Sequence, residues 1–193
     1  MKLVFATNNK HKFLEIRNML PESYELLTPE DLGYYGELPE THDTLEEKAA
    51  EKAVFIWNKF GYPCFADDSG LEVMALGGKP GVFSARYAGE NKDDLKNMQK
   101  LLNEMKSEKN REARFRTVIA LVKKNNPVFF EGILNGSILH EPAGSEGFGY
   151  DPVFKPEISE KSLAQMSLPE KNRLSHRARA VSLLINYLKG PEA

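Results

Sequence analysis

Strand-like and helix-like segments alternate along the first part of the chain, and this alternation restricts the fold more than any other feature. Residues of β-type cover Lys2 to Ala6, a helical pattern covers Lys10 to Leu20, and a second β-type run covers Tyr24 to Thr28. Thr44 and Glu47 then have the spacing of a capping box, which predicts a further helix of about four turns. Strands alternating with helices indicate an α/β fold.

A pair of aspartates follows the next β-type run. Pro63 to Ala66 is predicted to be a short buried strand and Leu71 to Leu76 another, with Asp67-Asp68-Ser69-Gly70 as a turn between them. This turn would place at least one carboxylate at the sheet edge, where ligands bind in open α/β folds. Gly77 to Gly81 is predicted to be a loop.

The second half of the chain predicts antiparallel strands. Asn91 to Ser107 is typical of a helix, with Leu95, Met98, Leu101, Leu102 and Met105 on its packed face. Two β-type runs are predicted to pair as a hairpin, Arg114 to Lys123 before Asn125-Asn126-Pro127 and Val128 to Leu134 after it. A last helix covers the residues from Ala178 to Lys189-Gly190-Pro191. We expect an α/β protein with a mixed central sheet flanked by helices.

Size and composition exclude several classes of protein. The 193 residues suit one domain, and 41% apolar with 28% charged residues is ordinary for a globular chain. Apolar runs are too short to span a bilayer, and no signal peptide is recognisable, so we expect a soluble cytoplasmic protein without a membrane partner. The net charge of −2 argues against a nucleic-acid partner. The single cysteine, Cys64, is expected to be buried.

The segment Thr7-Asn8-Asn9-Lys10-His11-Lys12 leads from the first strand into the first helix. Backbone N–H groups at a helix N-terminus attract anions, and Lys12 lies one turn into the helix, where it can reach a phosphate. The alternative is a capped helix start with solvated lysines. Walker and dinucleotide-binding loops are excluded, because the segment lacks their glycines.

Glu40, Asp67 and Asp68 are candidate acidic groups. Magnesium is commonly held by one or two carboxylates together with substrate phosphates, and Glu40 and Asp68 could supply such a pair. The alternative is that Asp67 and Asp68 belong to a plain Asx-type turn.

The segment Gly144 to Pro152 contains three glycines around Phe148. Glycine allows close approach of the backbone to a ligand, and an exposed aromatic ring offers a face on which a base can stack. The alternative is a loop whose Phe148 and Tyr150 fill the core.

The segment Lys171-Asn172-Arg173-Leu174-Ser175-His176-Arg177 ends at the start of the last helix. Ser175 can cap that helix, which leaves His176 and Arg177 at the positive end of its dipole. Cations are unfavourable there, so the pattern favours an anionic or carbonyl-bearing partner over a solvated charged surface.

Together these segments resemble the inosine triphosphate pyrophosphatase family, also called XTP/dITP diphosphatases. The similarity covers essentially the whole chain, in the order Thr7 to Lys12, Ala66-Asp67-Asp68-Ser69-Gly70-Leu71, Pro80 to Tyr87, Gly147-Phe148-Gly149-Tyr150-Asp151-Pro152 and Ser175-His176-Arg177. One departure is Glu146, where family members often have glycine. The resemblance implies one two-lobed domain over residues 1–193, with the substrate cleft between the lobes.

The resemblance also implies an enzyme that hydrolyses dITP, ITP, XTP or dXTP to the monophosphate and pyrophosphate, and so cleans the nucleotide pool. Glu40 and Asp68 would hold Mg²⁺, Asp68 would accept the proton of the attacking water, and Asp67 would be a supporting carboxylate. The implied substrate contacts are Thr7, Asn8, Asn9, Lys10, His11, Lys12, Ser69, Phe148, Gly149, Tyr150, Asp151, Lys171, His176 and Arg177.

Two other functions stay open at this point. One is a Maf-like pyrophosphatase for pyrimidine or modified nucleotides, although the N-terminal segment lacks that group's arginine-rich pattern. The other is a nucleotide- or RNA-binding module that uses Phe148 without turnover. The resemblance further implies a homodimer.

Overall fold

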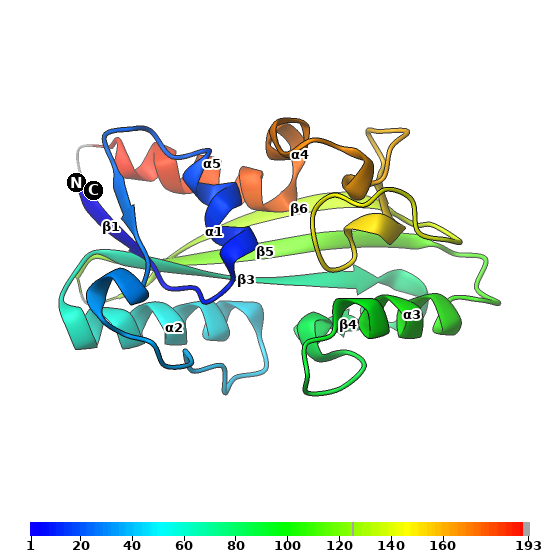
Figure 1. The fold of residues 1–193 in the computed structure, drawn as a ribbon, viewed down its shortest axis with the longest axis horizontal. Helices are drawn as coiled ribbons and strands as arrows, with labels where there is room; N and C mark the ends of the chain where they lie inside the picture. Colours follow the sequence, from blue (N-terminus) through cyan, green and yellow to red (C-terminus); the bar gives the residue numbers. More distant parts are fainter. Residues whose placement is uncertain (125, 191–193) are drawn as a thin grey trace. The chain divides into compact units, whose positions relative to one another are not determined.

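The computed structural model describes residues 1–124 and 126–190, which fold into two compact units (Figure 1). Unit 1 comprises Met1–Asp68, Thr117–Gly132 and 177–190, and unit 2 comprises Ser69–Arg116 and Ile133–His176. No helix among these described residues is both long enough and apolar enough to cross a membrane.

Unit 1 begins with parallel strands joined by helices. Strand β1 (Lys2–Phe5) pairs in parallel with β2 (Glu25–Leu27) and with β3 (Cys64–Val73). Helix α1 (Lys10–Arg17) connects β1 to β2, and α2 (Leu45–Phe60) precedes β3. This part of the chain is therefore an α/β fold, as the alternating pattern predicts.

Helices cover both faces of the unit 1 strands, because successive side chains of a strand point to opposite faces. Leu3 and Phe5 pack in one cluster with residues of α1 and α5 (His176–Leu188), whereas Val4 and Ala6 pack in another with α2 (Figure 1). Cys64 is fully buried, as predicted, and burial raises the pKa of its thiol to about 12.

Unit 2 contains antiparallel strand pairs and a hydrophobic core to which a helix contributes. Strand β4 (Pro80–Gly81) pairs antiparallel with β3, and β7 (Phe154–Pro156) pairs antiparallel with β6 (Val128–Ile138). The core joins β3, β6 and β7 to helix α3 (Asp94–Glu104) and strand β5 (Glu112–Val122). The remaining helix is α4 (Leu168–Leu174), and the short 3₁₀ helices are η1 (Glu30–Leu32), η2 (Met74–Leu76), η3 (Ser84–Arg86), η4 (Asp151–Val153) and η5 (Leu163–Gln165).

The pairing order of the strands is β2-β1-β3-β5-β6-β7, with β4 beside β3. Strands β3, β5 and β6 each contribute residues to both units. The sheet is mixed and helices flank it, which confirms the predicted fold class.

The expected turn at Asp67-Asp68-Ser69-Gly70 is wrong, because β3 runs unbroken from Cys64 to Val73. Gly70 lies against the backbone of β4, where a Cβ atom would come within 2.4 Å of the Gly81 carbonyl oxygen. Its small size therefore allows close strand pairing. The aspartates nevertheless lie at the predicted edge, because β1 pairs with β3 only as far as Phe65 and both aspartates follow just beyond the carboxyl end of β1.

Two predicted helices are shorter than expected. Helix α1 ends at Arg17 because the Met19 N–H bonds to the Ile16 carbonyl, which tightens the last turn. Helix α3 spans only Asp94–Glu104, and Leu95, which we expected on its packed face, is 72% exposed. Asn97 takes the buried position instead, and its amide bonds to the backbone of Ala85 and Ala88.

Other expectations are confirmed. Thr44 caps α2 by accepting the Glu47 N–H, as the capping-box pattern predicts. Strands β5 and β6 are neighbours, and the Ile138 N–H bonds to the Arg111 carbonyl, as in a hairpin. Helix α4 was not predicted, although its own capping box at Ser167 and Glu170 was a usable signal. Asn125 and Pro191, named in two predictions, lie outside the described residues.

Candidate active site

The side chains of Thr7 to Lys12 fix the turn into α1. Asn9 is the N-cap, and its Oδ1 accepts the Lys12 N–H at 3.1 Å, while Thr7 Oγ1 accepts the Asn9 N–H at 3.1 Å. Asn8, Lys10 and His11 are exposed. The segment therefore has the predicted capped helix start, and the Lys12 side chain leaves it toward β3.

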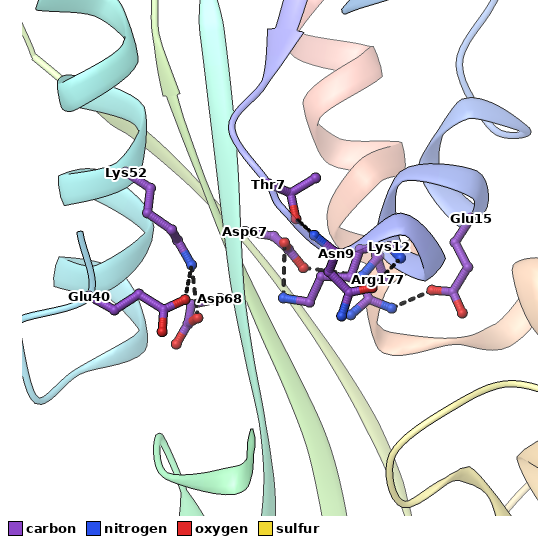
Figure 2. Close-up of polar contacts among 9 residues, drawn as sticks. All are labelled: Thr7, Asn9, Lys12, Glu15, Glu40, Lys52, Asp67, Asp68 and Arg177. Atoms are coloured by element: carbon purple, nitrogen blue, oxygen red, sulfur yellow. Dashed lines mark hydrogen bonds and ion pairs between the residues drawn. The ribbon is translucent and has the colours of Figure 1, made fainter. Parts of the chain in front are cut away.

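Asp67 is the centre of a buried charge cluster in unit 1 (Figure 2). Its Oδ1 accepts from Lys12 Nζ at 3.0 Å and its Oδ2 from Arg177 Nε at 3.1 Å, and Arg177 also pairs with Glu15 through Nη1. The side chains of Asp67 and Arg177 are only 1% and 2% exposed. Charges can be buried at this depth only when they are paired, so these contacts hold the cluster together.

The pKa values in this cluster follow from burial and pairing. Burial alone would raise the pKa of Asp67, but the charges of Lys12 and Arg177 outweigh it and lower that pKa well below its usual value. For Arg177, burial is likewise outweighed by the carboxylates, and its pKa is raised. For Lys12 burial dominates and lowers the pKa despite the charge of Asp67.

Asp68 points to the opposite face of β3 from Asp67, as consecutive residues of a strand must. There Lys52 of α2 donates to Asp68 Oδ1 at 3.0 Å and lies 3.7 Å from Glu40 Oε1 (Figure 2). Burial would lower the pKa of Lys52, but Asp68, Asp67 and Glu40 outweigh it and raise that pKa. One ammonium group thus binds both carboxylates that the sequence suggested for magnesium.

Lys52 is a candidate functional residue that the sequence reasoning missed. Its side chain is only 6% exposed, and it lies next to Ala53 and one turn before Ile56 on the buried face of α2. A lysine at such a position needs an anionic partner. The signal was therefore its placement on the apolar face of a helix.

The oxygen donors around Lys52 fit magnesium. Glu40 and Asp68 are carboxylates that share one cation, and Mg²⁺ is typically bound through one or two carboxylates with phosphates and water. Within residues 1–124 and 126–190, no group of three or more His, Cys, Asp or Glu side chains is placed to hold a metal ion.

In unit 2, the loop from Gly147 to Asp151 is held by a buried ion pair. Asp151 Oδ2 accepts the Phe148 N–H at 2.9 Å and the Lys171 ammonium at 2.6 Å, and Lys171 Nζ lies 4.9 Å from the Phe148 ring centre. Gly147 has φ of +77°, and a Cβ there would collide with Asp151. Tyr150 is buried, with its hydroxyl bonded to the Ser84 carbonyl, so this ring fills the core. Phe148 is half-buried.

The remaining basic candidates lie in the sequence around the start of α5. Helix α5 begins at His176, whose ring stacks on Phe115 with centres 4.6 Å apart and an angle of 10° between planes. Lys171, His176 and Arg177 are all buried, so the alternative of a solvated charged surface is wrong. Arg177 finds its anionic partners in Asp67 and Glu15 of unit 1. Ser69, after Asp68 on β3, is half-buried.

Each unit thus gathers its own chemistry. In unit 1, the cations and carboxylates come from α1, from α2 and the chain before it, from β3 and from the start of α5. This arrangement is suited to a polyphosphate and a metal ion. In unit 2, the Phe148 ring and the buried donors Lys171 and His176 are suited to a flat ring bearing a carbonyl.

Comparison with known proteins extends these observations. Residues 3–187 match the family model described as the Ham1 family. The chain is 51% identical over 189 residues to a dITP/XTP pyrophosphatase of Flavobacterium psychrophilum, covering 98% of this chain and 100% of that protein. It is 50% identical over 188 residues to a dITP/XTP pyrophosphatase of Porphyromonas gingivalis, covering 97% of each. The Staphylococcus aureus Ham1 protein superposes with a TM-score of 0.89 at 38% identity, covering 98% and 99% of the two chains.

Proposed function

The chain belongs to the Ham1 family, and on that premise we propose that it hydrolyses non-standard purine nucleoside triphosphates. The substrates are dITP, ITP, XTP and dXTP, and the products are the monophosphate and pyrophosphate. The enzyme removes these nucleotides before they enter DNA or RNA. The observation that carries the proposal is the group of Glu40, Lys52 and Asp68, which provides oxygen ligands and a buried cation beside a candidate base.

Unit 1 binds the triphosphate in this proposal. Lys12 and Lys52 offset the negative charge of the phosphates, which otherwise repels an attacking water. Asp68 orients that water and accepts its proton while the water oxygen bonds to the α-phosphorus. The bond from this phosphorus to the bridging oxygen breaks, and pyrophosphate leaves. Glu40 and Asp68 would hold magnesium together with the phosphates, and the bound ion would neutralise charge and lower the pKa of the attacking water.

Unit 2 recognises the base. Hypoxanthine and xanthine have a carbonyl at position 6, to which Lys171 and His176 can donate, while Phe148 contacts the ring face. Adenine has an amino group at that position, so its binding leaves buried donors unpaired. Guanine shares the carbonyl, and its rejection must therefore act at position 2.

Replacing Lys171 with alanine is expected to lower the ratio of kcat/KM for ITP to that for ATP by about tenfold or more, because the main donor to the carbonyl is lost. Steady-state rates on both nucleotides measure this ratio. Lys161→Ala is the matched control, since Lys161 is exposed and its ammonium pairs with Glu170 at the surface. An unchanged ratio in the Lys171 variant would show that other groups read position 6.

The test of the whole proposal is pyrophosphate release from dITP, XTP, dATP, dGTP and dTTP, with magnesium and with a chelator. We expect magnesium-dependent release from dITP and XTP and little from the others. Release confined to dTTP or to modified pyrimidines would favour a Maf-like activity. Binding of purine nucleotides without release from any of them would favour a binding module.

Two further properties are part of this proposal. We propose that the enzyme is a homodimer, which sedimentation of the purified protein would test. We also propose that it acts in the cytoplasm, where nucleotide pools are used, without a nucleic-acid or membrane partner.

A further inference from the structure

Glu40 lies on irregular chain between η1 and α2, so its position depends on what anchors that chain. Two neighbours of Glu40 are fixed. Leu38 is 9% exposed and packs in the core cluster that contains Ala49 and Ala53 of α2. On the other side, Thr41 is bound by Glu51, also on α2.

The contact between Glu51 and Thr41 uses both carboxylate oxygens. Oε2 accepts the Thr41 N–H at 2.8 Å, and Oε1 accepts the Thr41 hydroxyl at 2.6 Å. His42 Nδ1 also lies 3.2 Å from Oε2. Hydrogen bonds to an ionised carboxylate are stronger than neutral ones, and two of them fix the direction of the chain as well as its distance.

The residue after Glu51 on α2 is Lys52, which binds Asp68 and lies near Glu40. Consecutive residues of a helix point about 100° apart, so the helix presents one side chain to the loop and the next to the paired carboxylates. The same helical turn therefore sets the position of the loop backbone and the position of the cation between Glu40 and Asp68.

We infer that Glu51 is a positioning residue, which holds Thr41 so that the adjacent Glu40 stays beside Asp68 in readiness for a divalent cation. The inference rests on the proposed function, because it assigns Glu40 to metal binding. The apparent affinity for a ligand is reduced by the fraction of time that a binding loop spends in other conformations. A loop that is already ordered avoids this reduction. Glu51 itself touches neither metal nor substrate.

Glu51→Ala and Thr41→Val test this inference. If the loop without its anchor is in place for only about a tenth to a fifth of the time, divalent-cation affinity falls about five- to tenfold. We expect such a fall in Mn²⁺ binding measured by electron paramagnetic resonance without nucleotide, and in the Mg²⁺ concentration for half-maximal activity. The value of kcat at saturating Mg²⁺ should be nearly unchanged, and Glu51→Gln should partly restore affinity because its amide oxygen can still accept one bond.

Asp31→Ala is the matched control. The Asp31 carboxylate also accepts the N–H and hydroxyl of a threonine, Thr28, at 2.8 Å each, but that threonine does not adjoin a proposed metal ligand. The control should leave Mn²⁺ affinity unchanged even if its melting temperature falls.

Several results would overturn the inference. These are unchanged Mn²⁺ affinity in Glu51→Ala, an equal loss in Asp31→Ala, or no Mn²⁺ binding by the wild type. The proposed function fails separately, if the wild type binds Mn²⁺ but releases no pyrophosphate from any purine triphosphate. In that case the Mn²⁺ affinities of the variants still decide the role of Glu51.

Discussion

Asp68→Asn is expected to lower kcat for pyrophosphate release from dITP by about 10²- to 10⁴-fold, the usual contribution of a general base. The amide has nearly the shape of the carboxylate but cannot accept the proton of water, and it is a poorer ligand for magnesium. Lys12 and Lys52 remain in place, so dITP should still bind. Quenched-flow release assays and calorimetric titration with dITP measure the two effects separately.

Glu72→Gln provides the control for that experiment. Glu72 lies on the same strand as Asp68 and also pairs with a basic side chain, Arg114, at 2.6 Å. Its replacement should leave kcat within about twofold of the wild type, as for most surface changes away from a site. Wild-type turnover by Asp68→Asn would remove Asp68 from the mechanism.

Local physical signals were sufficient to predict much of the fold. The helix beginning at Leu45 was predicted because the Thr44 hydroxyl accepts the Glu47 N–H and donates to the Glu47 carboxylate within one turn, and this requires no distant partner. The capped turn from Asn9 to Lys12 was predictable for the same reason. Strand β1 was predicted because its β-type residues lie directly before that cap.

Features that depend on distant contacts were not predictable in this way. Gly70 was interpreted as a turn residue, yet its role is to admit the Gly81 carbonyl, and only the pairing of β3 with β4 reveals this. Leu95 fits the apolar stripe of α3 as well as Met98 does, but Leu95 is exposed and Asn97 is buried, with its amide bonded to the backbone of Ala85 and Ala88.

In the candidate site, too, single residues could be identified from the sequence, whereas contacts between distant residues could not. Sequence reasoning identified Asp67 and Arg177 as separate candidates, because 110 residues separate them along the chain. It therefore grouped Arg177 with Lys171 and His176 in one segment that favours an anionic or carbonyl-bearing partner. Arg177 instead forms ion pairs with Asp67 and Glu15, which indicates a role in fixing the charges of unit 1.

Arg177→Met is expected to lower the free energy of unfolding by about 3–5 kcal/mol, the usual cost of removing one partner from a buried charge pair. Methionine fills a similar volume, but Glu15 and Asp67 are left buried without the guanidinium, while Lys12 still pairs with Asp67. Urea unfolding measures the change. Arg179→Met, at an exposed position on the same helix, should change the free energy by no more than about 0.5 kcal/mol.

A second substitution separates charge pairing from packing as the cause. The double variant Glu15→Leu with Arg177→Met also removes the Glu15 carboxylate. Part of the lost stability should then return, because an apolar pair can replace a buried ion pair at little cost. If the double variant is instead less stable than Arg177→Met alone, the guanidinium stabilises unit 1 through packing. In that case, the low pKa of Asp67 would depend mainly on Lys12. The Arg177 variant should then also retain its activity at temperatures where it is folded.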